Sequence, residues 1–232
     1  MSRERIFAGV REALSGSGNG RARSRAVAER LANPPLHPAG ATGAPMLPVE
    51  LATRFKAHLQ RLGADPVEIA REGEIPSAIV NYLTARGLPM RLRRANDGPL
   101  ASLPWETAPA LTLDTGSAKA DDTAGLSHAV AGVAETGTLV LASGPESPLT
   151  LAFLPETHIV ALKADAIVAC YEEALAMVVA SCGGRLPRTV NLVTGASRTG
   201  DIGGKIVMGA HGPRRLAVLI YGPHTPSVPV SA

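Results

Sequence analysis

The stretch TVNLVTGASRTGDIGGKIVMGAHGPRRLAVLIY, residues 189–221, decides the fold of this chain. It begins and ends with short apolar runs, at residues 190–193 and 216–220, each bounded by Gly or Pro. Such runs predict two buried strands of an α/β sheet. Two loops of small residues, 194–201 and 209–214, lie between them. The stretch therefore predicts a sheet with a candidate site on its loops.

The first loop is the better candidate for binding an anion. A Gly-rich turn after a buried strand exposes backbone N–H groups at the carboxyl edge of the sheet, where open α/β sheets bind ligands. Arg198 can donate two hydrogen bonds to a carboxylate or phosphate. The alternative is a tight turn in which Arg198 pairs with Asp201. The candidate ligand-binding residues here are Gly195, Ser197, Arg198, Thr199, Asp201 and, from the second loop, His211.

Neither loop has the spacing of a known nucleotide-binding motif. The GxxxxGK[ST] pattern is absent, and residues 200–204 do not continue a GxGxxG motif after a strand. Binding of ATP or NAD is therefore not predicted. Ser143 lacks the GxSxG context of a nucleophile elbow, which argues against a serine hydrolase.

A second motif, AETGTLVLASGPES, covers residues 134–147. A hairpin turn alone would explain Gly137, but not an acidic Glu135 beside the hydroxyls of Thr136 and Thr138 in an apolar setting. A carboxylate at a sheet edge can serve as an acid/base, a nucleophile or a ligand for a substrate hydroxyl. Glu135 is therefore the catalytic candidate, with Thr136, Gly137 and Thr138 as ligand-binding candidates. A purely structural turn remains the alternative.

The composition indicates a globular protein with a core of small aliphatic side chains. Of the 232 residues, 45% are hydrophobic and only 3% are aromatic, so a base-stacking surface for nucleic acid is not expected. The formal net charge is +3, and much of the basic excess lies in arginines of the first 30 residues. We interpret that segment as a solvated arm and predict no nucleic-acid partner.

The cysteine content limits which cofactors this chain can hold, and the hydropathy indicates where in the cell the protein is expected. Cys170 and Cys182 are the two cysteines, without CxxC or zinc-type spacing, so no metal site and no iron–sulfur cluster is expected in this chain. No apolar run reaches transmembrane length, and no signal-peptide pattern is evident. The sequence predicts a cytoplasmic protein without a transmembrane segment.

Hydrophobic periodicity predicts an N-terminal arm, residues 1–45, followed by a compact domain, residues 46–232. The arm should contain a helix over 2–14, a weaker helix over 21–31 and a Pro-rich linker. In the domain, strands and helices alternate with short turns, which implies parallel βαβ units. The expected helices cover 49–62, 75–86, 149–154 and 165–181, the last capped by Asp165; the expected strands cover 66–70, 90–93, 110–115 and 158–162, with a hairpin at 129–142.

With both motifs in view, the chain resembles the lactate-utilisation (LUD) domain family, in its protein C branch. The resemblance rests on AETGTLVLASGPES and TGASRTGDIGGKIVMGAHGPRRLAVLI, with LPETHIVALKADAIVACYEEAL between them. It is strongest over residues 114–221. Related chains often have GPSRTADIE where this one has GASRTGDIG at 195–203, so a Gly replaces an acidic residue at position 203.

The resemblance implies a three-layer α/β/α fold with a mainly parallel sheet, similar to the ribose-5-phosphate isomerase, glucosamine-phosphate deaminase and CoA-transferase class. It also implies a non-cluster subunit of a complex that oxidises L-lactate to pyruvate, whose partner subunits carry the iron–sulfur clusters. A small carboxylate or phosphate is the expected ligand. Two alternatives stay open: a stand-alone isomerase or acyl/CoA-transferase-like enzyme on a small anionic substrate, and a scaffold whose loops only dock partners.

Overall fold

The structure is a computed structural model. It describes residues 3–15, 20–33, 46–202 and 205–223. The chain divides into two compact units, Met1–Thr42 and Gly43–Ala232.

The N-terminal unit contains two helices, α1 (Arg3–Ser15) and α2 (Gly20–Ala32). They match the helices that the sequence predicts over 2–14 and 21–31. No residue of either helix is buried. The predicted Pro-rich linker lies, for the most part, outside the described residues.

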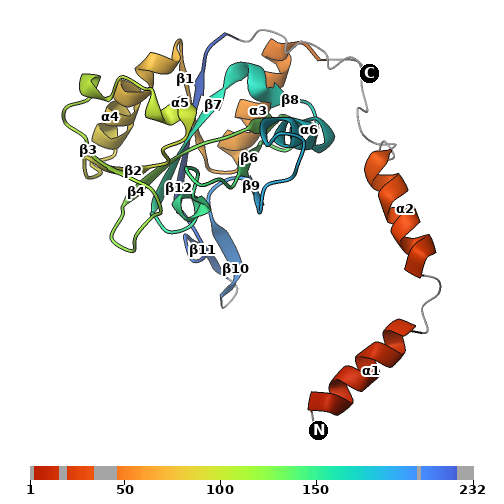
Figure 1. The fold of residues 1–232 in the computed structure, drawn as a ribbon. Coiled ribbons are helices and arrows are strands. Elements are labelled where there is room, and N and C mark those ends of the chain that lie inside the picture. Colours follow the sequence, from red (N-terminus) through yellow and green to blue (C-terminus); the bar gives the residue numbers. More distant parts are fainter. Residues whose placement is uncertain (1–2, 16–19, 34–45, 203–204, 224–232) are drawn as a thin grey trace. The chain divides into compact units, whose positions relative to one another are not determined.

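Six strands of the second unit form one sheet, in the order β1-β12-β7-β4-β2-β3, and every neighbouring pair is parallel (Figure 1). The central strands are continuous buried runs, as expected for a parallel sheet covered on both faces. The predicted α/β class with a mainly parallel sheet is confirmed. The strands are β1 (Asp65–Ile69), β2 (Arg91–Arg94), β3 (Thr112–Thr115), β4 (Ala124–His128), β7 (Thr157–Lys163) and β12 (Arg215–Tyr221).

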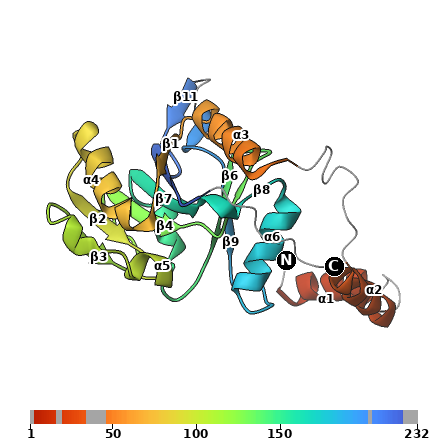
Figure 2. The ribbon, with the colours of Figure 1, turned by 90° about the horizontal axis from the view of Figure 1, so that it is seen from above.

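Helices and a smaller sheet cover the two faces of this sheet (Figures 1 and 2). On one face, α4 (Ile75–Ala85) and α5 (Gly98–Ala101) enclose a core that includes Ile79, Leu92 and Leu126. On the other face, α3 (Pro48–Arg61) and the smaller sheet enclose a second core. Helix α6 (Tyr171–Ser181) packs on the outer side of the smaller sheet.

The smaller sheet has the order β8-β5-β6-β9. Its strands β5 (Ala131–Val133) and β6 (Thr138–Ala142) form the predicted antiparallel hairpin. Strand β8 (Ile167–Val168) pairs with β5, and β9 (Val190–Val193) pairs with β6. A two-stranded ribbon, β10 (Arg198–Ile202) and β11 (Lys205–Met208), extends the loop that follows β9.

Three local predictions are wrong. The run at 190–193 does not form a buried strand of the main sheet; as β9 it is an edge strand of the smaller sheet, with Leu192 49% exposed. Asp165 does not cap a helix, because Ile167–Val168 pairs with β5 and α6 begins only at Tyr171. The segment 149–154 forms only a 3₁₀ turn, Leu149–Ala152.

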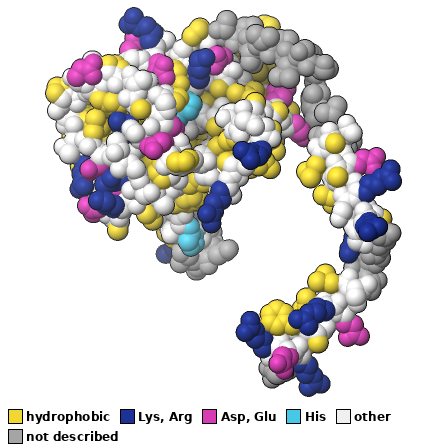
Figure 3. Space-filling model, in the orientation of Figure 1, with side chains coloured by type: hydrophobic (Ala, Val, Ile, Leu, Met, Phe, Trp, Pro, Cys, Tyr) yellow, Lys and Arg dark blue, Asp and Glu magenta, His cyan; other side chains and the backbone are white. Residues whose placement is uncertain are grey.

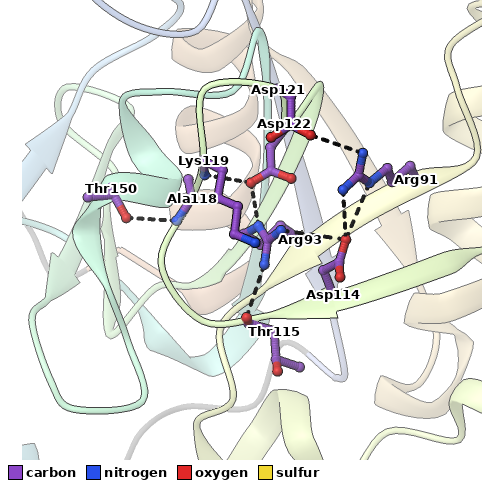
Figure 4. Close-up of polar contacts among 9 residues, drawn as sticks. All are labelled: Arg91, Arg93, Asp114, Thr115, Ala118, Lys119, Asp121, Asp122 and Thr150. Carbon is purple, nitrogen blue, oxygen red and sulfur yellow. Dashed lines mark hydrogen bonds and ion pairs between the residues drawn. The ribbon is translucent and has the colours of Figure 1, made fainter.

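A buried ion pair ties strand β2 of the main sheet to the loop after β3 (Figure 4). Arg93 of β2 is 4% exposed, and its Nε donates to the carboxylate of Asp122. The backbone amide of Lys119 donates to the same carboxylate at 2.6 Å, and Arg93 also donates to the Thr115 carbonyl at 3.1 Å. Nearer the surface, Arg91 pairs with Asp114 and Asp121. Arg93 and Asp122 therefore compensate each other inside the fold.

Among the described helices, none has the length and the apolar character needed to cross a lipid bilayer. On the face of the second unit drawn in Figure 3, charged side chains of both signs are interspersed. That face has no extended surface of a single charge.

Candidate functional site

The turn between β5 and β6 carries a partly buried cluster of hydroxyl groups. Thr138 is fully buried, and its Oγ1 lies 2.8 Å from Thr136 Oγ1, 2.9 Å from the Tyr171 hydroxyl and 2.8 Å from Thr194 Oγ1. Thr136 also donates to Tyr171, at 3.0 Å. The sequence predicted Thr136 and Thr138 as site residues. It missed Tyr171, which lies far away in the chain, and it placed Thr194 in the first loop without a binding role.

Glu135 and Gly137 lie in the same turn and face different surroundings. Glu135 is half-buried, and its backbone amide donates to the Ala169 carbonyl at 3.2 Å. Within the described part of the chain, its carboxylate makes no hydrogen bond or ion pair. Gly137 has a φ of +72°, and a Cβ there would lie 2.6 Å from the Cβ of His58 in α3. Only glycine fits this close packing of the turn on α3.

The loop after β9 lines a hollow of about 380 Å³, together with the end of α3 and the segment before β12. The predicted residues Gly195, Ser197, Arg198 and His211 all line it. Glu135 and the turn at 136–138 are not among its lining residues. The structure thus connects the turn at 135–138 to the first loop through the Thr138–Thr194 hydrogen bond, but the turn does not line the hollow.

Arg198 is the cation of the hollow. Its guanidinium lies against Gly63, at the position that a Cβ of this residue would take, and no described carboxylate pairs with it. Thr199, in β10, hydrogen-bonds to His211 Nδ1 at 3.0 Å. Asp201 also belongs to β10, but its side chain lies outside the described part of the structure. A solvent-accessible guanidinium at the wall of a hollow can bind a carboxylate or a phosphate.

One backbone amide of the first loop is already used within the fold. The Ser197 amide donates to the Pro213 carbonyl at 2.9 Å, and the Ser197 carbonyl accepts from Gly209 at 2.9 Å. These bonds hold the two loops together, so the Ser197 N–H is not free for a ligand. The charged group that the hollow offers an anion is the side chain of Arg198.

The hollow lies at the amino edge of the parallel sheet, not at the predicted carboxyl edge. Its lining includes His158 and Leu216, which are paired residues near the starts of β7 and β12. The second loop precedes β12, so it can lie only at the amino end of that strand. The carboxyl edge instead carries His128, whose Nε2 lies 3.1 Å from the Tyr221 hydroxyl. Burial lowers the pKa of His128 and raises that of Tyr221.

Two further polar residues of the hollow were not predicted from the sequence. His158 is 1% exposed, and Asn191 is half-buried. Among the described residues, His158 Nδ1 and Asn191 Nδ2 have no hydrogen-bond partner. The one feature of the sequence that could have indicated His158 as a site residue was a lone His within the apolar run of β7.

Replacing Gly195 by alanine is expected to destabilise the fold by roughly 1–3 kcal/mol and to displace the loop. Gly195 has a φ of +86°, and a Cβ there would lie 2.8 Å from the Leu62 carbonyl oxygen. Gly200→Ala is the matched control, because nothing lies within 4 Å of its Cβ position and its φ is not positive. Thermal unfolding of both variants measures the difference. Equal midpoints would show that the loop does not depend on Gly195.

Comparison with known proteins places these features in a family. The sequence model of the LUD domain matches residues 52–221. A protein of Neisseria meningitidis is 38% identical over 100 residues, which are 43% of this chain and 42% of that protein. Lactate utilization protein C of Geobacillus kaustophilus is 34% identical over 90 residues, 38% of each chain. The matched region thus spans about two fifths of the length of these relatives.

Two proteins of Deinococcus radiodurans extend the comparison over most of the chain. Its lactate utilization protein C is 29% identical over 192 residues, which are 77% of this chain and 83% of that protein. The crystal structure of a DUF162 family protein from the same organism superimposes with a TM-score of 0.57 and 26% identity. That superposition covers 77% of this chain and all of the other.

Proposed function

This chain belongs to the LUD domain family, and from that premise we propose that it acts in lactate utilisation. The support is that relatives in Geobacillus and Deinococcus are named lactate utilization protein C. The Deinococcus protein matches over most of both chains.

The finer proposal is that the chain is the non-cluster subunit of a complex that oxidises L-lactate to pyruvate. This oxidation releases two electrons and two protons, and iron–sulfur clusters in partner subunits would accept the electrons. Cys170 and Cys182, a buried and a half-buried free thiol, are too few to ligate a cluster. In such a complex, this subunit would bind and position the carboxylate of the substrate.

The observation that carries the proposal is the Arg198 guanidinium in a hollow of about 380 Å³ with no described carboxylate beside it. A guanidinium can hold a carboxylate through two parallel hydrogen bonds. The Ser197 and His211 side chains line the same hollow and can complete the contact. The expected ligand is a small carboxylate such as lactate, with phosphate as a chemically similar probe.

A second candidate function follows from Glu135. Its carboxylate has no described partner and lies in the turn that carries the hydroxyl cluster of Thr136 and Thr138. A stand-alone isomerase or acyl/CoA-transferase-like enzyme would need such a base or nucleophile. This function would place the chemistry at the turn, outside the hollow.

Growth on L-lactate separates the two functions. A strain that lacks the gene should grow poorly on L-lactate, and the wild-type gene should restore growth. Arg198→Ala should fail to restore it, whereas Arg214→Ala, which changes an arginine paired with Glu156 outside the hollow, should succeed. Glu135→Gln should also restore growth if this subunit only binds the carboxylate and does not catalyse a reaction with Glu135. Normal growth of the deletion strain would rule out the role in lactate utilisation.

A further inference from the structure

His158 lies at the wall of the hollow but belongs to neither predicted loop. The residue is 1% exposed and is the second residue of β7, after the equally buried Thr157. One ring nitrogen, Nε2, lies 3.0 Å from Ser127 Oγ of the neighbouring strand β4. The other, Nδ1, has no partner among the described residues. The ring is therefore fixed at one end and has one unused hydrogen-bonding position at the other.

An unused position of this kind is costly in a fold. A buried polar atom without a partner destabilises a protein, and in native structures such atoms usually bind water or a ligand. Asn191 Nδ2 is a second such atom in the lining of the same hollow. Ala152, Val193 and Leu216 line the same hollow. Two unpartnered polar groups in the wall of one hollow indicate that something polar occupies this part of it.

We propose that His158 is a specificity-determining residue of the hollow, whose Nδ1 hydrogen-bonds an oxygen on the carbon next to the anion held by Arg198. This inference rests on the proposed function, because it concerns the same ligand. The ligand class is then a small 2-hydroxy or 2-oxo carboxylate, in preference to a plain monocarboxylate. Ser127 is a positioning residue, because it holds the ring through Nε2.

The charge state of the ring suits this role. Burial lowers the pKa of His158 to about 3, so the imidazole is neutral near pH 7. A neutral ring has one N–H and one lone pair, and it can therefore donate to a carbonyl or accept from a hydroxyl. It adds no charge to the hollow, so attraction of the anion is left to Arg198.

Calorimetric titration of the full chain with L-lactate, pyruvate and propionate tests the inference. Propionate has the same carboxylate but no oxygen on carbon 2. The wild type should bind lactate or pyruvate about tenfold more tightly than propionate, the discrimination expected for one hydrogen bond. In His158→Phe this preference should disappear, while the affinity for propionate changes less than about threefold.

If His158→Phe does not fold, nitrogen-15 NMR of the histidine rings in the wild type tests the same inference. The Nδ1 resonance of His158 should move on addition of L-lactate and stay in place with propionate. If all three acids bind equally and depend on Arg198, or the resonance does not respond, the role of His158 is overturned and the anion site stands. If none of them binds, the proposed ligand of the hollow fails together with the inference.

Discussion

Replacing Asp122 by alanine is expected to lower the free energy of unfolding by about 3–5 kcal/mol, because it removes the buried partner of Arg93 and leaves only the half-exposed Asp114, at 3.5 Å, among its described carboxylates. Arg93 is 4% exposed, and the Asp122 side chain is 1% exposed. For a domain of this size, the melting temperature should fall by about 6–20 °C. Chemical denaturation monitored by circular dichroism measures the change.

Asp121→Ala is the matched control for this variant. Asp121 pairs with Arg91 at the surface, at 3.3 Å, with its side chain 66% exposed. An exposed pair of this kind contributes less than about 1 kcal/mol. If the two variants lost the same stability, Arg93 would not depend on Asp122.

The effect of Asp122→Ala should depend on pH. Burial opposes ionisation of Asp122, but the hydrogen bonds from Arg93 and the Lys119 amide outweigh it and hold the pKa of the carboxyl below its usual 3.8. Because the pKa of Asp122 is lower in the folded state than in the unfolded state, the ionised carboxylate stabilises the fold at pH values above the pKa of the unfolded state. This contribution is lost as the pH falls through the pKa of the folded state. The stability difference between wild type and variant should be complete at pH 7 and should shrink below about pH 4.

Arg198→Ala is expected to weaken binding of L-lactate and of inorganic phosphate by about 10- to 100-fold, the loss typical for a charge-assisted hydrogen bond. The guanidinium is the cation of the hollow, and the Ser197 amide, already bonded to Pro213, cannot replace it. Titration calorimetry of wild type and variant measures the loss. Raising the salt concentration should weaken wild-type binding as well, because Arg198 is exposed.

Arg214→Ala separates this site-specific effect from a general loss of positive charge. Arg214 is the last residue of the second loop and pairs with Glu156 at 3.1 Å, outside the lining of the hollow. Its removal changes the net charge equally but should change the affinity less than about twofold. Equal losses in both variants would mean that the anion is attracted by overall charge, without a defined site.

Local patterns were sufficient to predict much of the fold. The hairpin at 129–142 was correct because two apolar runs enclose Gly137, whose positive φ forms the turn. Asp165 was misread because an acidic residue before an apolar run resembles a helix cap. The pairing of Ile167–Val168 with β5, a contact distant in sequence, keeps that segment extended. Tertiary contacts of this kind override local propensity.

The site was harder to predict than the fold, because contacts between residues distant in sequence bring its residues together. Arg198 and His211 could be selected from the chemistry of their loops, and both line the hollow. His158 could not, because its partner Ser127 lies 31 residues away and a lone His in a strand is commonly structural. The edge of the sheet was also misassigned, since the sequence did not show that β9 belongs to the smaller sheet.

Mapping of backbone amide chemical shifts during titration with L-lactate tests the anion site most directly. The shifts should be confined to the amino edge of the main sheet, at Gly195, Arg198, Gly212 and the start of β7, and Arg198→Ala should require at least about tenfold more L-lactate to produce them. Shifts that cluster instead at the carboxyl edge, around His128 and Tyr221, would contradict a site in the hollow.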